Sequence, residues 1–407
     1  MSLNLKSPAD GSAPSAVPTP DTLVERAAAL RPVLSERAGE TEASRRVSRD
    51  TMDLLAEKEL LDMCKPARFG GYEYGPSAMV RVGYELGQAC GSTAWCAMLA
   101  NCNAWFGSYW PLRAQEEVWG AGNEKNLIAA PLAPTGKCAP VEGGYHLWGR
   151  WPFASNCENS AWAIIAAIVP ESSQGPSGAA WFLTPMSTLK IDQDTWHVAG
   201  MQGTGSKTLY ADEPIFVPAH RLVRLSDIAA LTTPGSQIEG NVLARFAWPT
   251  FGAAGLVAPL LGMARGALDW YVGNMRSKVR PGAAASAADN PFVQERAGRA
   301  AAALDATLNL LLTDLAEAEA VVFAGARLEQ SQRIRIRRDF GYAARQSVDI
   351  VNSLYGASGA SAAELGRPIQ RFWRDVNAGA GHVSLDDNAI MAMTGQLMFG
   401  LTPTGAH

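Results

Sequence analysis

The chain is poor in the residues and patterns that mark several large classes of protein. It has only six cysteines, and no two of them form a Cys-x-x-Cys pair, which argues against a zinc site. The first residues lack a charged-then-apolar leader, so we expect reduced thiols and a cytoplasmic protein. The five histidines have no metal-ligand spacing, so we expect no bound metal.

An excess of charge of one sign is also lacking. Lys and Arg number 35 against 39 Asp and Glu, a formal net charge of −4. Without a basic surface, nucleic acid is not an expected partner. Residues 246–264 carry no charge and have about the length of a membrane span, but Pro249 and Pro259 interrupt them. We expect a buried helix there and no membrane partner.

What the chain does contain is enough apolar residues for a large core. Of its 407 residues, 47% are hydrophobic and 18% are charged, which is typical of a globular protein. Residues 1–20 are rich in Ser, Pro, Ala and Gly, and we expect a flexible tail.

Three patterns follow one another after this tail. Residues 21–125 are predicted to form a helical domain, including one long helix over residues 79–103. Residues 126–235 are predicted to form a β-domain, since the apolar run Trp162–Val169 ends at Pro170. Residues 236–407 are predicted to form a helical bundle. Its apolar stripe steps by three and four through Leu304, Leu308, Leu311, Leu315, Ala318 and Val322.

Several motifs add to this order of domains. Pro66–Gly71 and Gly91–Trp95 lie in the first region, and Trp151–Cys157 and Trp196–Ser206 lie in the second. Near the C-terminus, Arg374-Asp375 precedes His382. In order and spacing these motifs resemble the acyl-CoA dehydrogenase fold over roughly residues 22–400. That resemblance implies an α+β protein with an N-terminal helical domain, a middle β-domain and a C-terminal four-helix bundle.

His382 stands where acyl-CoA dehydrogenases usually carry a catalytic Glu. In this respect the chain resembles the oxygenase components of two-component flavin monooxygenases, a group that includes the p-hydroxyphenylacetate hydroxylases. The resemblance implies an enzyme that uses reduced FMN or FAD and O2, through a flavin C4a-hydroperoxide, to hydroxylate an aromatic or polycyclic small molecule. A separate NAD(P)H:flavin reductase and a homotetramer are implied as well.

The same resemblance suggests which residues contact the flavin. Ser155, in Trp151–Cys157, is expected near flavin N5, where its hydroxyl would take part in catalysis. Thr204, Gly205 and Ser206 are expected to bind the flavin through hydroxyl and backbone groups. Arg276 is expected to contact a cofactor phosphate, for which a guanidinium is well suited.

His382 is the second expected catalytic residue, because a histidine can take a phenolic proton near neutral pH. Arg374 and Asp375 are interpreted as a structural ion pair that shapes the site. The basic run 333–338 is interpreted as a solvated face or a subunit contact, with cofactor-phosphate binding as the alternative.

Other functions stay open at this point. Oxygenation of sulfur or of an amine nitrogen is possible on the same fold. An acyl-CoA dehydrogenase would need Asp386 or Asp387 as a shifted acid. A non-catalytic scaffold is the third class.

Overall fold

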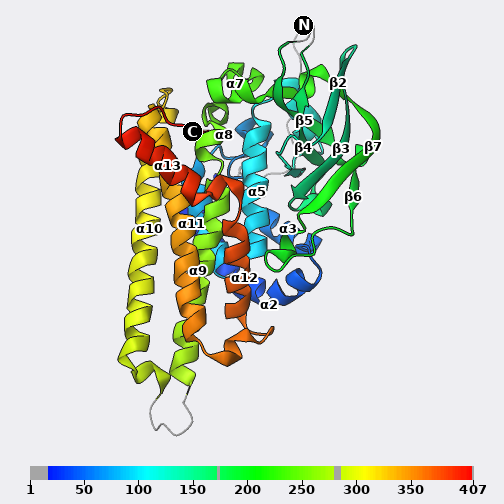
Figure 1. The fold of residues 1–407 in the computed structure, drawn as a ribbon. Helices are drawn as coiled ribbons and strands as arrows, with labels where there is room; N and C mark the ends of the chain where they lie inside the picture. Colours follow the sequence, from blue (N-terminus) through cyan, green and yellow to red (C-terminus); the bar gives the residue numbers. More distant parts are fainter. Residues whose placement is uncertain (1–16, 172–174, 279–285, 406–407) are drawn as a thin grey trace, which may run out of the picture.

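The computed structural model describes residues 17–171, 175–278 and 286–405. Most of the predicted tail, residues 1–16, lies outside this described part. The chain forms a helical region, a β-domain and a bundle of long helices, in that order (Figure 1). The predicted fold class is confirmed.

The first region consists of helices that pack around the long helix α5. Their bounds are α1 Pro20–Ala29, α2 Arg31–Ala43, α3 Arg49–Glu57, α4 Pro76–Gly87, α5 Gly91–Gly107 and α6 Leu112–Trp119. The single helix predicted over residues 79–103 is wrong, because Cys90 is extended (φ −149°) and separates α4 from α5. A Cβ on Gly87 would lie 2.7 Å from the Pro259 carbonyl oxygen, so the end of α4 packs directly on the bundle.

The β-domain contains two four-stranded sheets. The strands are β1 Ile128–Ala129, β2 Lys137–Val141, β3 Gly144–Ala154, β4 Trp162–Val169, β5 Gly178–Pro185, β6 Lys190–Asp192, β7 Lys207–Pro218 and β8 Leu222–Arg224. The orders are β1-β4-β5-β8 and β2-β3-β7-β6. The predicted strand Trp162–Val169 is confirmed as β4. Trp151 links the sheets, because its indole N–H donates to the Ala166 carbonyl oxygen at 2.8 Å.

The C-terminal region is built from long antiparallel helices. They are α9 Ala254–Ser277, α10 Pro291–Phe323, α11 Gln330–Ala357, α12 Pro368–Ala380 and α13 Asp387–Met398, and two short helices precede them, α7 Leu225–Ala230 and α8 Trp248–Phe251. The predicted stripe is buried along α10, with Leu308 half-buried. Trp248–Ser277 is apolar and long enough to cross a membrane, but it is mostly buried in the protein, as expected for a core helix.

Short 3₁₀ helices join these elements. They are η1 Ala67–Phe69, η2 Cys157–Asn159, η3 Met186–Thr188, η4 Gln202–Thr204, η5 Ala219–Arg221, η6 Pro234–Gln237, η7 Val242–Arg245, η8 Ala287–Asp289, η9 Ala360–Ala363 and η10 Val383–Leu385. Helix α5 lies between the β-domain and the bundle (Figure 1). It packs against η4 on one side and against α9 and α12 on the other. The loops of the β-domain therefore meet the bundle across α5.

Candidate active site

Three hydroxyl side chains from two loops of the β-domain form a continuous chain of hydrogen bonds. Thr204 Oγ1 donates to the Met201 carbonyl oxygen at 2.8 Å, because a carbonyl can only accept. Thr204 Oγ1 lies 2.7 Å from Ser206 Oγ, which in turn lies 2.6 Å from Ser155 Oγ. Each hydroxyl has one proton, so Ser155 must donate to Ser206, and Ser206 to Thr204. The free capacity of Ser155 is therefore that of an acceptor.

The backbone around Ser155 departs from regular strand geometry. The pairing of β3 with β7 shifts register between Trp151 and Ala154, a bulge of the kind that often re-aims side chains beside active sites. Asn156 is left-handed (φ 58°), and its N–H donates to the Thr204 carbonyl oxygen at 2.9 Å. Asn tolerates this left-handed conformation better than most residues other than Gly.

Two aromatic residues beside this hydroxyl chain were not predicted as site residues. Phe153 and Trp196 both have φ 67°, which is costly for aromatic residues. The Phe153 side chain is 66% exposed, and the two ring centroids lie 6.1 Å apart, edge to face. Strained backbone that holds an apolar ring in solvent indicates a surface that contacts a ligand. Backbone strain of this kind leaves no mark in a single sequence.

His382 lies at the start of η10, on the bundle side of the site. The Ser384 backbone N–H donates to His382 Nδ1 at 3.1 Å, so the neutral ring carries its proton on Nε2. Desolvation, and then the positive charge of Arg337, lower the pKa of His382 to about 4. His382 is exposed at the surface of the protein, and with its lowered pKa it presents an uncharged Nε2–H donor at neutral pH.

Helix α5 brings His382 and the hydroxyl chain to one place. The Trp95 ring contacts the His382 ring edge-on, with centroids 6.2 Å apart. The next residue, Cys96, donates its S–H to the Thr204 carbonyl oxygen at 3.6 Å. Two of the predicted site elements, Ser155-Thr204-Ser206 and His382, therefore flank the same turn of α5.

The prediction that Arg374 and Asp375 form an ion pair with each other is wrong. Asp375 is buried and accepts the Met201 N–H at 2.6 Å, and burial raises the pKa of its carboxyl to about 6. Arg374 instead pairs with Glu42 of α2 at 2.5 Å and donates to the Ala199 carbonyl oxygen at 2.7 Å. Adjacent residues on a helix point in different directions, so each fixes a different part of loop 199–201.

The remaining cofactor residues are placed differently. Gly205 is left-handed (φ 53°) between Thr204 and Ser206 and lies in the hydroxyl loop as expected. Arg276 is exposed in the last turn of α9, and that end of α9 lies at the end of the bundle away from the β-domain (Figure 1). One copy of the chain does not bring Arg276 to Ser155, and its role in phosphate binding stays a prediction.

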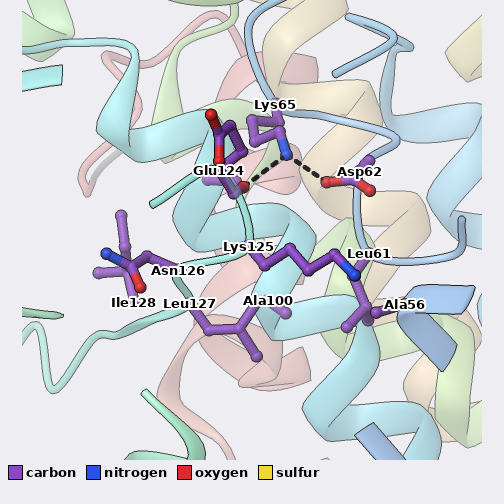
Figure 2. Close-up of a pocket in the computed structure, with 11 residues that line it drawn as sticks. Ala56, Leu61, Asp62, Lys65, Ala100, Glu124, Lys125, Asn126, Leu127 and Ile128 are labelled. Carbon is purple, nitrogen blue, oxygen red and sulfur yellow. Dashed lines mark hydrogen bonds and ion pairs between the residues drawn. The ribbon is translucent and has the colours of Figure 1, made fainter. Parts of the chain in front are cut away.

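A cavity near Lys65 lies outside this site. Its lining residues come from α3, α5 and the segment before β1, and Figure 2 shows Lys65 pointing toward Asp62 and the Glu124 backbone. Lys65 Nζ pairs with Asp62 and donates to the Glu124 carbonyl oxygen at 3.0 Å. The volume of about 40 Å³ suits one or two water molecules rather than a flavin.

Comparison with known proteins identifies the family of the chain. Residues 25–111 match the family model "Acyl-CoA dehydrogenase, N-terminal domain", and residues 254–387 match "Acyl-CoA dehydrogenase, C-terminal domain". The chain is 36% identical to the FADH(2)-dependent resorcinol hydroxylase oxygenase component of Rhizobium sp., covering 95% of this chain and 96% of that protein. It is 34% identical to the flavin-dependent monooxygenase oxygenase subunit HsaA of Rhodococcus jostii, covering 94% and 99%.

Solved structures give the same result. The 3-HSA hydroxylase of Rhodococcus sp. RHA1 superposes with a TM-score of 0.88 at 34% identity, covering 94% of this chain and 98% of that one. XiaF from Streptomyces sp., in complex with FADH2 and glycerol, superposes with a TM-score of 0.85 at 27% identity, covering 95% and 98%. The chain therefore belongs to the flavin-dependent monooxygenase oxygenase components that are built on the acyl-CoA dehydrogenase fold.

Proposed function

We propose that this monooxygenase uses reduced FMN or FAD and O2 to hydroxylate a phenolic or larger aromatic small molecule. A separate NAD(P)H:flavin reductase would supply the reduced flavin. The observation that carries this proposal is the directed hydroxyl chain, which ends on Ser155 across α5 from a neutral His382.

The residues around Ser155 fit a reduced flavin. Reduced flavin carries a proton on N5, and Ser155 Oγ can accept a hydrogen bond from it because its own proton is committed to Ser206. Phe153 and Trp196 offer apolar faces for a flat ring, while Thr204, Gly205 and Ser206 fix the loop that carries this contact. When bound, the flavin supplies the electrons and the activated oxygen. The protein holds the ring and keeps the N5 proton in place.

The pKa of His382 distinguishes two possible roles for it, general base and hydrogen-bond donor. A phenol has a pKa near that of Tyr, about 10, whereas the pKa of His382 is about 4. Complete transfer of the phenolic proton to His382 is therefore unfavourable. Donation of a hydrogen bond from Nε2–H to the substrate oxygen carries no such cost. We therefore propose that His382 orients and polarises the substrate hydroxyl, and we keep general-base catalysis as the alternative.

A phenolic substrate is favoured by the more similar relatives. One relative at 36% identity is named a resorcinol hydroxylase, and the p-hydroxyphenylacetate 3-hydroxylase of Acinetobacter baumannii is 24% identical over 95% of this chain. A dibenzothiophene monooxygenase shares only 19% identity, which is evidence of a common fold alone. Oxygenation of sulfur or nitrogen is accordingly the second candidate.

We further propose a cytoplasmic homotetramer. Several large apolar side chains of the C-terminal segment are exposed, including Met398, Phe399 and Leu401, and a neighbouring copy would cover them. In such an assembly Arg276 could reach the phosphate of a flavin held by another copy. Light scattering at micromolar concentration should give four times the mass of the chain, and a monomer would contradict the proposal.

The proposed activity is tested by a single turnover with isotopically labelled oxygen. The protein is mixed anaerobically with photoreduced FMN or FAD and either resorcinol or p-hydroxyphenylacetate, and ¹⁸O2 is then admitted. We expect one ¹⁸O atom in a hydroxylated aromatic product, measured by mass spectrometry. Quantitative release of hydrogen peroxide with every phenol, together with sulfoxidation of a thioether probe, would transfer the assignment to sulfur oxygenation.

A further inference from the structure

The basic run on α11 contains two arginines, Arg333 and Arg337, that pair with no carboxylate of the described residues, and Arg337 is the one whose charge acts on His382. Arg335 pairs with Asp314 and Glu317, and Arg338 pairs with Asp339. Arg337 donates from Nη1 to the Pro249 carbonyl oxygen at 3.0 Å, and no carboxylate of the described residues lies within ion-pair distance of it. Its Nε is buried and has no hydrogen-bond partner in that part of the chain. Arg337 is half-buried, so it is not part of a fully solvated face, and the subunit contact predicted for this run stays a prediction.

An unpaired guanidinium in such a place destabilises the fold. Arg337 is half-buried, and burial lowers its pKa because the charged form loses hydration. A single neutral carbonyl does not compensate for that loss. A charge kept in this position is accounted for if a bound anion completes its hydrogen bonds.

The elements around Arg337 lie on the bundle side of the site, where His382 is. Helix α11 packs against α8, which carries Pro249, and against η10, which His382 caps. One turn after Arg337, a Cβ on Gly341 would lie 3.6 Å from Asp387, at the start of the helix that follows η10. The positive charge of Arg337 also contributes to the lowered pKa of His382, in keeping with the packing of α11 against η10.

We propose that Arg337 is a specificity-determining residue that binds an anionic oxygen of the aromatic substrate beside His382. This inference rests on the proposed function, because it takes the His382 side of α5 as the place where the substrate lies. Arg337 would supply the positive charge, and His382 Nε2–H a neutral donor, to the same end of the ligand. The anionic oxygen is that of a phenolate or of a carboxylate on the ring substituent, and the test below distinguishes them.

The test uses a ligand whose ionisation can be seen without turnover. The phenolate of 4-nitrophenol is yellow and the phenol is not, and it ionises near neutral pH. Binding to the full-length protein is followed by absorbance from pH 5.5 to 8.5, a range chosen to bracket that ionisation. We expect the wild type to bind the phenolate more tightly and so to shift its ionisation to lower pH.

Arg337→Met removes the guanidinium while keeping much of its volume. We expect it to reduce the preference for phenolate about ten-fold or more, as for the loss of a charge-assisted hydrogen bond. Arg345→Met is the matched control, since Arg345 lies on the same helix, is exposed and pairs with Asp349. It should behave like the wild type. Arg337→Lys keeps the charge and should retain part of the preference, even if the methionine variant folds poorly.

A second pair of ligands identifies the source of the anion. p-Hydroxyphenylacetate and tyrosol share a phenol, but only the first carries a carboxylate. If Arg337 binds the carboxylate, Arg337→Met should weaken p-hydroxyphenylacetate about ten-fold and leave tyrosol unchanged. If it binds the phenolate, both should weaken by the same factor.

Two results would overturn the inference. One is a folded Arg337→Met or Arg337→Gln protein that still hydroxylates its substrate and in which neither the phenolate preference nor the binding of p-hydroxyphenylacetate has changed. The other is loss of the oligomer in these variants, which would make Arg337 a contact between copies of the chain. Failure of the proposed function is a separate result, because it would appear in the wild type as the absence of any labelled hydroxylated product.

Discussion

Alanine variants of Ser206 and Ser155 should rank in one order for loss of folding stability and in the opposite order for their effect on the flavin. Ser206 takes part in two buried hydrogen bonds, to Ser155 and to Thr204, whereas Ser155 takes part in one of them. At about 1 kcal/mol for each bond, Ser206→Ala should lower the free energy of unfolding by about 2 kcal/mol and Ser155→Ala by about 1 kcal/mol. The flavin should be affected more by Ser155→Ala than by Ser206→Ala, because only Ser155 is placed to accept a hydrogen bond from N5–H.

The flavin effect is measured by mixing reduced-flavin complexes with O2 in a stopped-flow instrument. The observable is the decay of the transient absorbance that precedes oxidised flavin. Ser155→Ala should speed this decay about ten-fold, the equivalent of one hydrogen bond of about 1–2 kcal/mol. Ser206→Ala should speed it less, since Ser155 remains but its proton loses its partner.

Ser160→Ala is the control for this pair. Ser160 lies in the same loop and donates to the Asn156 carbonyl oxygen at 3.0 Å, outside the hydroxyl chain. Denaturant unfolding supplies the stability ranking. If Ser206→Ala decays as fast as Ser155→Ala and Ser160→Ala does too, the loop as a whole sets the lifetime, and the directed chain is not its cause.

Two further predictions concern the bundle side of the site. His382→Ala should slow oxygen transfer roughly 100-fold without slowing formation of the transient absorbance. His382→Asn should recover part of that rate if the role of His382 is to donate a hydrogen bond from Nε2–H. A break in the pH–rate profile of the wild type near pH 6.5 that disappears in both variants would instead favour general-base catalysis. Asp375 has a folded-state pKa of about 6 against about 4 when unfolded, so its contribution to stability falls as pH rises between these values. Asp375→Asn should therefore raise the free energy of unfolding above pH 6 by at most about 3 kcal/mol, as measured by urea titration at pH 7.5. A variant that is less stable than the wild type at this pH would show that Arg374 and Arg371 need the negative charge of the carboxylate.

The order of the three regions could be predicted because each has its own period. The continuous apolar run Trp162–Val169 favours a buried strand because it is short and ends at Pro170, and the stripe from Leu304 to Val322 favours one face of a helix. The break between α4 and α5 could not be predicted in this way. It arises where Gly87 packs on Pro259, a contact between residues far apart in the sequence.

In the candidate site, too, some residues could be predicted from the sequence and others could not. Motif resemblance led to Ser155, Thr204, Ser206 and His382, and the structure brings them to one turn of α5. The partners of Arg374 and Asp375 were not predictable, because they come from α2 and from loop 199–201. Phe153 escaped notice because its importance lies in a backbone angle, and Arg337 because only tertiary packing distinguishes it from the other arginines of its run.

The central claim is that this chain binds a flavin already reduced elsewhere and holds its N5 proton on Ser155. It is tested most directly by anaerobic calorimetric titration with photoreduced and with oxidised flavin, on the wild type and on Ser155→Ala. We expect tighter binding of the reduced form, with a preference that falls about ten-fold in the variant because the N5–H acceptor is lost. Stoichiometric retention of oxidised flavin, together with oxidation of NADH by this chain alone, would contradict the account.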